Sequence, residues 1–101
     1  MNLERISDLV RVAKALSVPQ RVRILKMILQ RPMYVQEIAE DMKMPYALAH
    51  LHLRALEEAG ILKAEYIEIK EPKPHKRKMY YAKDFEIIIN NQVIMGLKDE
   101  R

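Results

Sequence analysis

The sequence contains no cysteine, only two glycines and no long apolar run. Without cysteine it can form neither disulfides nor a thiolate metal site, and nothing in it indicates a secreted protein. Gly60 and Gly96 cannot form a glycine-rich phosphate loop, and no histidine stands at a useful spacing from a carboxylate, so we expect no enzyme and no cofactor. No apolar run approaches the ~20 residues of a membrane span. We therefore expect a soluble, cytoplasmic protein without a signal peptide or membrane contact.

What the sequence does have is ample apolar content and one concentrated basic stretch. Half of its 101 residues are apolar, which suits a single domain over residues 1–101. A chain this short buries a modest fraction of its surface, so a partner subunit would add stability. The formal net charge is +4, and residues 70–78 account for it, with five cations against Glu71. A local basic patch indicates a nucleic-acid partner more strongly than a diffuse excess does.

Residues 35–59 show two amphipathic patterns separated by a break at Lys43-Met44-Pro45. Apolar residues recur in each at three- to four-residue spacing, which places them on one helix face. They are Ile38, Ala39 and Met42 in the first pattern and Ala49, Leu53 and Leu56 in the second. Pro45 suits the first turn of the second helix, and Gly60 is the expected stop. The pattern predicts a helix-turn-helix whose second helix faces outward, with its first residues free to reach base edges.

Residues 52–62 read HLRALEEAGIL, and residues 15–29 read ALSVPQRVRILKMIL. The first segment resembles the end of the recognition helix in the ArsR family of winged helix-turn-helix transcription regulators, and the second resembles that family's second helix. Residues 35–42 are similar to its positioning helix and residues 79–81 to its returning wing strand. The resemblance covers about two thirds of the chain. It implies a dimeric DNA-binding regulator that acts as a repressor.

The helix that begins at Pro19 is expected to run to the break at Arg31-Pro32 and to supply the central core stripe. Val18 stands where the family usually has a capping Asp, so we expect a cap weaker by ~1 kcal/mol unless Ser17 substitutes. Met33-Tyr34 lies where a winged-helix fold places its first strand.

Metal ligands typical of this family are missing from the sequence. Metal-sensing relatives carry a Cys-x-Cys-like site where this chain has Tyr34, Val35 and Gln36, and a second family site uses Asp and His across C-terminal helices, where this chain has no histidine. His50 and His52 lie about 200° apart around a helix, so their rings cannot meet one ion. We predict no structural or sensory metal.

The outer face near the start of the second helix carries the residues expected to contact DNA. These are Tyr46, Ala47, His50, Leu51 and Arg54. A guanidinium fork matches phosphate oxygens, so Arg54 is expected on phosphate and His50 on a base or phosphate. His52 is expected to pair with core or backbone groups. Leu48 and Leu51 suit thymine methyl groups; the alternative is that they contact a protein partner.

After Gly60 the apolar pattern becomes alternating, which predicts a β-hairpin wing over residues 61–83. The returning strand is expected at residues 78–82, and the tip, residues 71–77, contains two prolines that block further pairing. A basic tip beside a helix-turn-helix is expected to follow the DNA backbone or enter the minor groove. The plainer alternative is a soluble edge protected against aggregation. The expected DNA contacts in the wing are Lys73, His75, Lys76, Arg77 and Lys78.

Both terminal segments are rich in apolar residues. Asn2 is a plausible N-cap for a helix over residues 1–17, and Asp84 for a helix over residues 84–98 that is apolar almost all round. Packing within one small domain covers only part of such faces, so we expect the two helices to form a two-fold dimer interface. Recognition helices would then lie about 34 Å apart. The expected interface residues are Leu3, Ile6, Val10, Phe85, Ile88, Ile89, Val93 and Met95.

The sequence thus predicts a mainly α (α+β) winged helix-turn-helix with a small antiparallel wing and terminal dimerisation helices. We expect a homodimeric, sequence-specific regulator of transcription that binds double-stranded DNA at an inverted-repeat operator; repression is implied by the resemblance alone. The alternatives are a winged-helix module for protein–protein interaction and a nonspecific, chromatin-type DNA-binding protein. The sequence identifies neither the operator nor a small-molecule effector.

Overall fold

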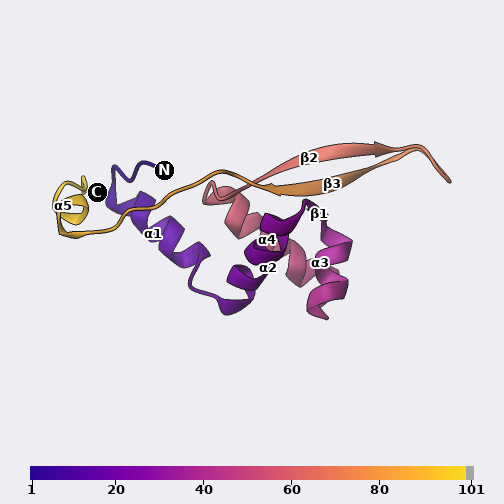
Figure 1. Cartoon of the computed structure of the whole chain (residues 1–101), viewed down its shortest axis with the longest axis horizontal. Coiled ribbons are helices and arrows are strands. Elements are labelled where there is room, and N and C mark those ends of the chain that lie inside the picture. The colour runs from indigo at the N-terminus through magenta and orange to yellow at the C-terminus, as the bar shows by residue number, and fades with distance from the viewer. Residues whose placement is uncertain (100–101) are drawn as a thin grey trace.

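Three helices form the body of the molecule (Figure 1). They are α2 (Pro19–Gln30), α3 (Val35–Met42) and α4 (Tyr46–Glu58). The structure is a computed structural model that describes residues 1–99. The mainly α (α+β) class and the three body helices agree with the sequence prediction.

A three-stranded antiparallel sheet lies beside these helices, and its hairpin extends away from the body (Figure 1). The strands β1 (Met33–Tyr34), β2 (Leu62–Ile69) and β3 (His75–Ala82) pair in the order β1-β3-β2. The β2–β3 register runs from Leu62 opposite Ala82 to Ile69 opposite His75. β3 therefore begins earlier than predicted, because residues 75–77 find partners in β2 and only residues 70–74 remain unpaired. Lys76 and Arg77 belong to the strand and not to the tip.

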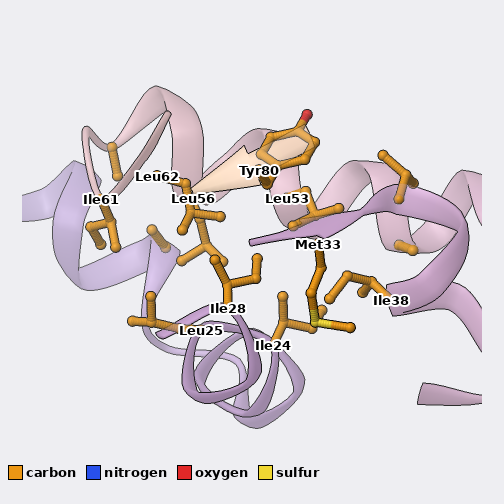
Figure 2. Close-up of a cluster of buried hydrophobic side chains, with 14 of the residues drawn as sticks. Ile24, Leu25, Ile28, Met33, Ile38, Leu53, Leu56, Ile61, Leu62 and Tyr80 are labelled. Carbon is orange, nitrogen blue, oxygen red and sulfur yellow. The ribbon is translucent and has the colours of Figure 1, made fainter. Parts of the chain in front are cut away.

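The core lies where the three body helices meet the sheet (Figure 2). In Figure 2 the α2 side chains Ile24 and Ile28 lie below Leu53 and Leu56, and the Tyr80 ring lies on the far side of the cluster with its hydroxyl pointing away. All of these side chains are almost completely buried. Burying each large apolar side chain contributes about 1.5–3 kcal/mol, so these few residues supply much of the folding free energy.

Both predicted breaks in the helix-turn-helix occur. Lys43 takes a left-handed conformation (φ 53°), which ends α3. Pro45 is the N-cap of α4, one position earlier than expected, and its carbonyl accepts from the N–H groups of Leu48 and Ala49. After α4, Gly60 has φ +80° and the Ile61 N–H returns to the Leu56 carbonyl at 3.0 Å, which closes the last turn.

The N-terminal helix is shorter than predicted. α1 spans Ile6–Ala15, and its N-cap is Arg5 and not Asn2. The Asp8 carboxylate accepts from the N–H groups of Glu4 (3.2 Å) and Arg5 (3.0 Å), so Asp8 satisfies the first turn and fixes where the helix begins.

α2 begins without a side-chain cap. Its N-cap is Val18, and no side-chain hydrogen bond closes its first turn. The Ser17 hydroxyl instead donates to the Lys14 carbonyl at 2.7 Å, at the end of α1. Ser17 therefore does not substitute for the missing Asp, and Pro19 at the first helical positions is the local signal that starts α2.

The prediction of a C-terminal helix over residues 84–98 is wrong. Residues 83–89 have no helical structure, and only the short α5 (Asn91–Met95) is helical. The β-branched run Ile87-Ile88-Ile89 disfavours a helix. The Asn90 side chain accepts from the Val93 N–H at 2.9 Å, so α5 is capped there and not at Asp84.

The two terminal segments lie together at one end of the molecule, opposite the wing (Figure 1). The Met1 ammonium donates to the Glu86 carbonyl (2.9 Å), the Ile6 N–H donates to the Lys98 carbonyl (3.0 Å), and the Lys98 N–H donates to the Glu4 carbonyl (2.9 Å). The molecule measures 55 × 27 × 25 Å, with a radius of gyration of 15.8 Å. A compact chain of this length has about 13 Å, so both ends project from the body. Within residues 1–99 no helix has the length and apolarity needed to cross a bilayer.

Candidate nucleic-acid interface

The first turns of α4 and the wing border a common groove of about 420 Å³. It is lined by Val35, Gln36, Tyr46, His50, Tyr66, His75, Lys76, Arg77 and Lys78. The structure thus brings six of the predicted DNA contacts together, from two elements far apart in sequence. Three of these side chains are cationic, and no described carboxylate lines the groove. Such a surface attracts an anion.

The outer face of α4 presents both aromatic and apolar side chains. Tyr46 is 52% exposed, and Leu48 and Leu51 are 40% and 62% exposed. Ala47 is also exposed, and the half-buried His50 ring stacks on Tyr46 with 6.3 Å between centroids. Together these residues form a surface that can meet base edges as well as phosphates.

Arg54 lies further along the same face and is paired with Glu58. Its Nε is 3.1 Å from Glu58 Oε1, and the two side chains are 65% and 63% exposed. An exposed pair of this kind contributes only a few tenths of a kcal/mol. Arg54 can therefore exchange this partner for a phosphate at little cost.

His52 faces inward, as the sequence predicted, but its partner is the Arg21 side chain and not a core or backbone group. Its Nδ1 accepts a hydrogen bond from Arg21 Nε at 3.1 Å, and Arg21 Nη1 also donates to the Lys14 carbonyl at 3.2 Å. Burial, and after it the positive charge of Arg21, lower the pKa of His52 from its ordinary value. The half-buried Arg21 thereby links α4 to the end of α1.

Lys78 and Tyr80 of β3 both contact Glu57 of α4. Lys78 Nζ is 3.4 Å from Glu57 Oε1, and the Tyr80 hydroxyl donates to the same oxygen at 3.5 Å. Burial raises the pKa of Tyr80. For Lys78, burial alone would lower the pKa, but Tyr80 and Glu57 outweigh it and the pKa is raised. Lys78 is therefore a charged group held against α4.

Arg77 lies against the start of α3. Its guanidinium is 4.0 Å from the centroid of the Tyr34 ring, and Nη2 donates to Gln36 Oε1 at 3.2 Å. Of the five wing residues predicted to contact DNA, Arg77 and Lys78 are thus engaged with the body, whereas Lys73, His75 and Lys76 are exposed. The His75 ring Nδ1 lies 2.7 Å from the Lys73 carbonyl.

Four residues of this region were not found from the sequence: Tyr34, Gln36, Glu57 and Tyr66. Tyr66 could have been found, because alternation along β2 and its pairing with Lys78 place both residues on one face of the hairpin. The other three act through contacts between distant elements, for which the sequence carries no local signal.

The residues predicted for a dimer interface lie on the terminal segments. Ile6, Val10, Ile88, Ile89 and Met95 are between 40% and 86% exposed. Leu3, Phe85 and Val93 are half-buried within the chain. These segments form the end of the molecule that is remote from the wing (Figure 1).

Comparison with known proteins gives a consistent set of relatives. A model of the bacterial regulatory protein, arsR family, matches residues 18–64. An uncharacterised HTH-type transcriptional regulator of Methanocaldococcus jannaschii is 32% identical over 93 residues, which cover 92% of this chain and 95% of the relative.

Solved structures extend the match to the fold. One is the solution structure of a homodimeric winged helix-turn-helix DNA-binding domain from Mycobacterium bovis, a possible ArsR-family transcriptional regulator, with a TM-score of 0.65 and 28% identity. The match covers 76% of this chain and 65% of that chain. Reduced HlyU from Vibrio cholerae has a TM-score of 0.62 at 20% identity, covering 86% of this chain and 78% of HlyU, and shows the fold alone.

These matches agree with the arrangement of α2, α3, α4 and the wing. The family model covers the three body helices and the start of β2, and the solved structures confirm the predicted winged helix-turn-helix. The chain belongs to the ArsR family of winged helix-turn-helix transcription regulators.

Proposed function

We propose that this protein is a homodimeric, sequence-specific DNA-binding regulator that represses transcription by occupying an inverted-repeat operator. The observation that carries the proposal is the groove between the first turns of α4 and the wing, where Tyr46 and His50 face His75 and the exposed Lys76. In this arrangement α4 enters the major groove, and the wing follows the backbone toward the adjacent minor groove.

The contacts proposed for α4 combine positioning with base recognition. Tyr46 lies at the start of α4, where free N–H groups favour a phosphate, and its hydroxyl can donate to the same group. His50, next to it, reaches a base or a phosphate. The exposed Leu48 and Leu51 suit thymine methyl groups, and Arg54 takes a phosphate in place of Glu58. Ala47 allows the helix to approach closely.

The contacts proposed for the wing are independent of DNA sequence. Lys73, His75 and Lys76 are exposed along the hairpin. Each lysine that neutralises a phosphate releases a counterion, so the affinity gained in this way falls as salt rises. The wing therefore supplies affinity, whereas the side chains of α4 supply discrimination between bases.

The dimer is proposed from the exposed apolar side chains of the terminal segments. Ile88, Ile89 and Met95 are 56%, 52% and 86% exposed in the single chain, and a second copy would cover them across a two-fold axis. The related Mycobacterium bovis domain is described as homodimeric. A dimer presents two copies of α4 to two half-sites, which requires a spacing of about 34 Å.

The proposal includes no metal-sensing site. Residues 34–36, the position of a thiolate site in metal-sensing relatives, are Tyr, Val and Gln, and Tyr34 and Gln36 contact Arg77. Within residues 1–99 no cluster of three potential metal ligands occurs. We propose that the regulator acts in the cytoplasm.

Footprinting on genomic fragments, followed by salt titration on the protected fragment, tests this function. Wild type is compared with Lys73→Ala/Lys76→Ala and with the matched control Lys14→Ala/Lys26→Ala, which removes two exposed lysines from α1 and α2. Each phosphate contact contributes about 0.9 to the slope of log K against log salt, and the wing variant lacks two lysines in each of the two protomers. Its slope should therefore fall by about 3.6, and that of the control should not change. A protected site without two-fold symmetry, or equal slopes in all three proteins, would contradict the proposal.

A second candidate function rests on the exposed Leu48 and Leu51. Apolar side chains on a recognition helix also suit a winged-helix module that binds a protein. Such a module would bind DNA weakly at every salt concentration, without the slope expected above. Equal affinity for unrelated duplexes would indicate a nonspecific chromatin-type protein instead.

A further inference from the structure

The root of the wing is held from both faces. Successive side chains of a strand point to opposite faces, and Arg77 and Lys78 are successive residues of β3. Arg77 contacts Tyr34 and Gln36, at the start of α3, while Lys78 contacts Glu57 on α4. Each helix of the helix-turn-helix therefore holds one of the two residues, and the hairpin projects from this point.

Lys78 is enclosed more closely than a phosphate-binding lysine needs to be. The side chains of Lys78 and Glu57 are 24% and 33% exposed, against 65% and 63% for Arg54 and Glu58. The Lys78 ammonium is also 5.2 Å from the centroid of the Tyr80 ring and 6.0 Å from that of Tyr66. A phosphate that reached Lys78 would displace Glu57 and leave a carboxylate uncompensated beside DNA, which is unfavourable.

We infer that Lys78 and Glu57 are positioning residues that set the angle between the recognition helix and the wing, and that Lys78 does not bind phosphate. The inference rests on the proposed DNA binding and deepens it, because it assigns the geometry of the half-site to one internal ion pair. Lys73 lies five residues beyond Lys78, up to about 15 Å along the hairpin. A small tilt at the root therefore moves the exposed cations away from the backbone they contact.

Exchange of the two charges tests the inference on the DNA fragment that wild type protects. Glu57→Lys and Lys78→Glu each break the pair. The double variant restores an ion pair with the positions of the two charges exchanged, and its net charge equals that of wild type. The readout is the ratio of affinities for the protected fragment and an unrelated duplex. Each single change should lower this ratio about tenfold, within the range of coupled neighbours, and the double variant should recover it to within about threefold.

The Arg54–Glu58 pair provides the matched control, because it lies on the same helix and is exposed. Arg54 is proposed to bind phosphate, so Arg54→Glu/Glu58→Arg should not recover the affinity lost in Arg54→Glu. Thermal unfolding of every variant separates loss of fold from loss of geometry.

The salt slope of the double exchange variant gives a second readout, because this variant restores the pair but carries no cation at position 78. If Lys78 only positions the wing, the double variant keeps the wild-type salt slope, whereas Lys76→Met, which removes one contact from each protomer of the dimer, loses about 1.8. A slope lowered by that amount in the double exchange variant, or a double exchange variant as weak as Lys78→Glu, would overturn the inference and leave DNA binding intact. A wild-type protein that binds no duplex would overturn the proposed function as well.

Discussion

At the scale of single residues, His52 links three helices. It lies on α4, accepts from Arg21 on α2, and through Arg21 is connected to the Lys14 carbonyl at the end of α1. An imidazole nitrogen accepts only while it carries no proton. The link therefore requires a neutral His52, which agrees with a pKa lowered first by burial and then by the charge of Arg21.

This requirement predicts a pH dependence of stability. The folded pKa of His52 lies below its ordinary value of 6.5, so the unfolded chain takes up the proton first as pH falls. The contribution of His52 to the free energy of unfolding should therefore be constant above its ordinary pKa of 6.5 and decrease as pH falls below 6.5. Urea unfolding between about pH 5 and 8, above the range of most carboxylates, measures this slope.

The variant His52→Gln should have a flatter profile over this range, whatever its absolute stability, because the titrating group is gone. His75→Gln is the matched control, since it removes an exposed histidine from the wing, and it should keep the wild-type slope. Equal slopes for wild type and His52→Gln would show that His52 does not couple protonation to folding.

For residues such as His52, the sequence predicts which way the side chain faces, but not which residue it contacts. Helical spacing puts His52 beside Leu53 and Leu56, away from the outer face. Its partner Arg21 is 31 residues away in the sequence, and Glu57 is 21 residues from Lys78. These contacts depend on how helices and strands pack, so local pattern places the candidate DNA contacts on α4 and misses the ion pair beneath the wing.

At the scale of elements, single residues that fix or free the backbone mark the ends of the body helices, which were predicted correctly. The C-terminal segment, whose helix was predicted wrongly, lacks such marks at the predicted ends. Pro19, Pro45 and Gly60 mark helix ends by fixing φ or permitting a positive φ, and the body helices begin or end beside them. Residues 84–97 are apolar almost all round, so they have no period that separates a helix from an extended segment. There, the Ile87-Ile88-Ile89 run and the Asn90 cap decide the structure.

The two glycines allow a matched test of the turn at Gly60, which ends α4. Gly60 has φ +80°, and an added Cβ would lie an ordinary 3.6 Å from Met1 Cε, so the cost of Gly60→Ala comes from the backbone. We expect a loss of about 1–2 kcal/mol in the free energy of unfolding. Gly96 has φ −84°, so Gly96→Ala should be neutral or stabilise by up to about 1 kcal/mol. Urea unfolding measures both; equal effects would mean that the turn after α4 tolerates a side chain.

At the scale of the whole molecule, the two ends have different characters. The wing is basic, polar at its tip and able to stand in water. At the other end, α1 buries only Val12 and Ala15, and backbone hydrogen bonds such as that from Ile6 to Lys98 join the terminal segments. Apolar side chains at that end remain exposed to solvent in a single copy of the chain.

Placing a charge at this end should therefore separate the proposed dimer without unfolding the chain. Ile88 and Met95 are 56% and 86% exposed in one copy, so Ile88→Lys and Met95→Lys disturb little within it. Across an interface each would bury an unpaired ammonium, and we expect the dissociation constant of the dimer to rise more than about 100-fold. Sedimentation equilibrium measures this rise, and circular dichroism checks the fold.

Leu29→Lys is the control, because Leu29 is 58% exposed but lies on α2, outside the terminal segments, and it should leave the dimer unchanged. Loss of the dimer should also weaken operator binding while the affinity for a single half-site is kept, because each copy retains its own α4 and wing. Variants that remain dimeric, or a wild type that is monomeric at micromolar concentration, would place the interface elsewhere or remove it. In that case the exposed isoleucines would need another partner.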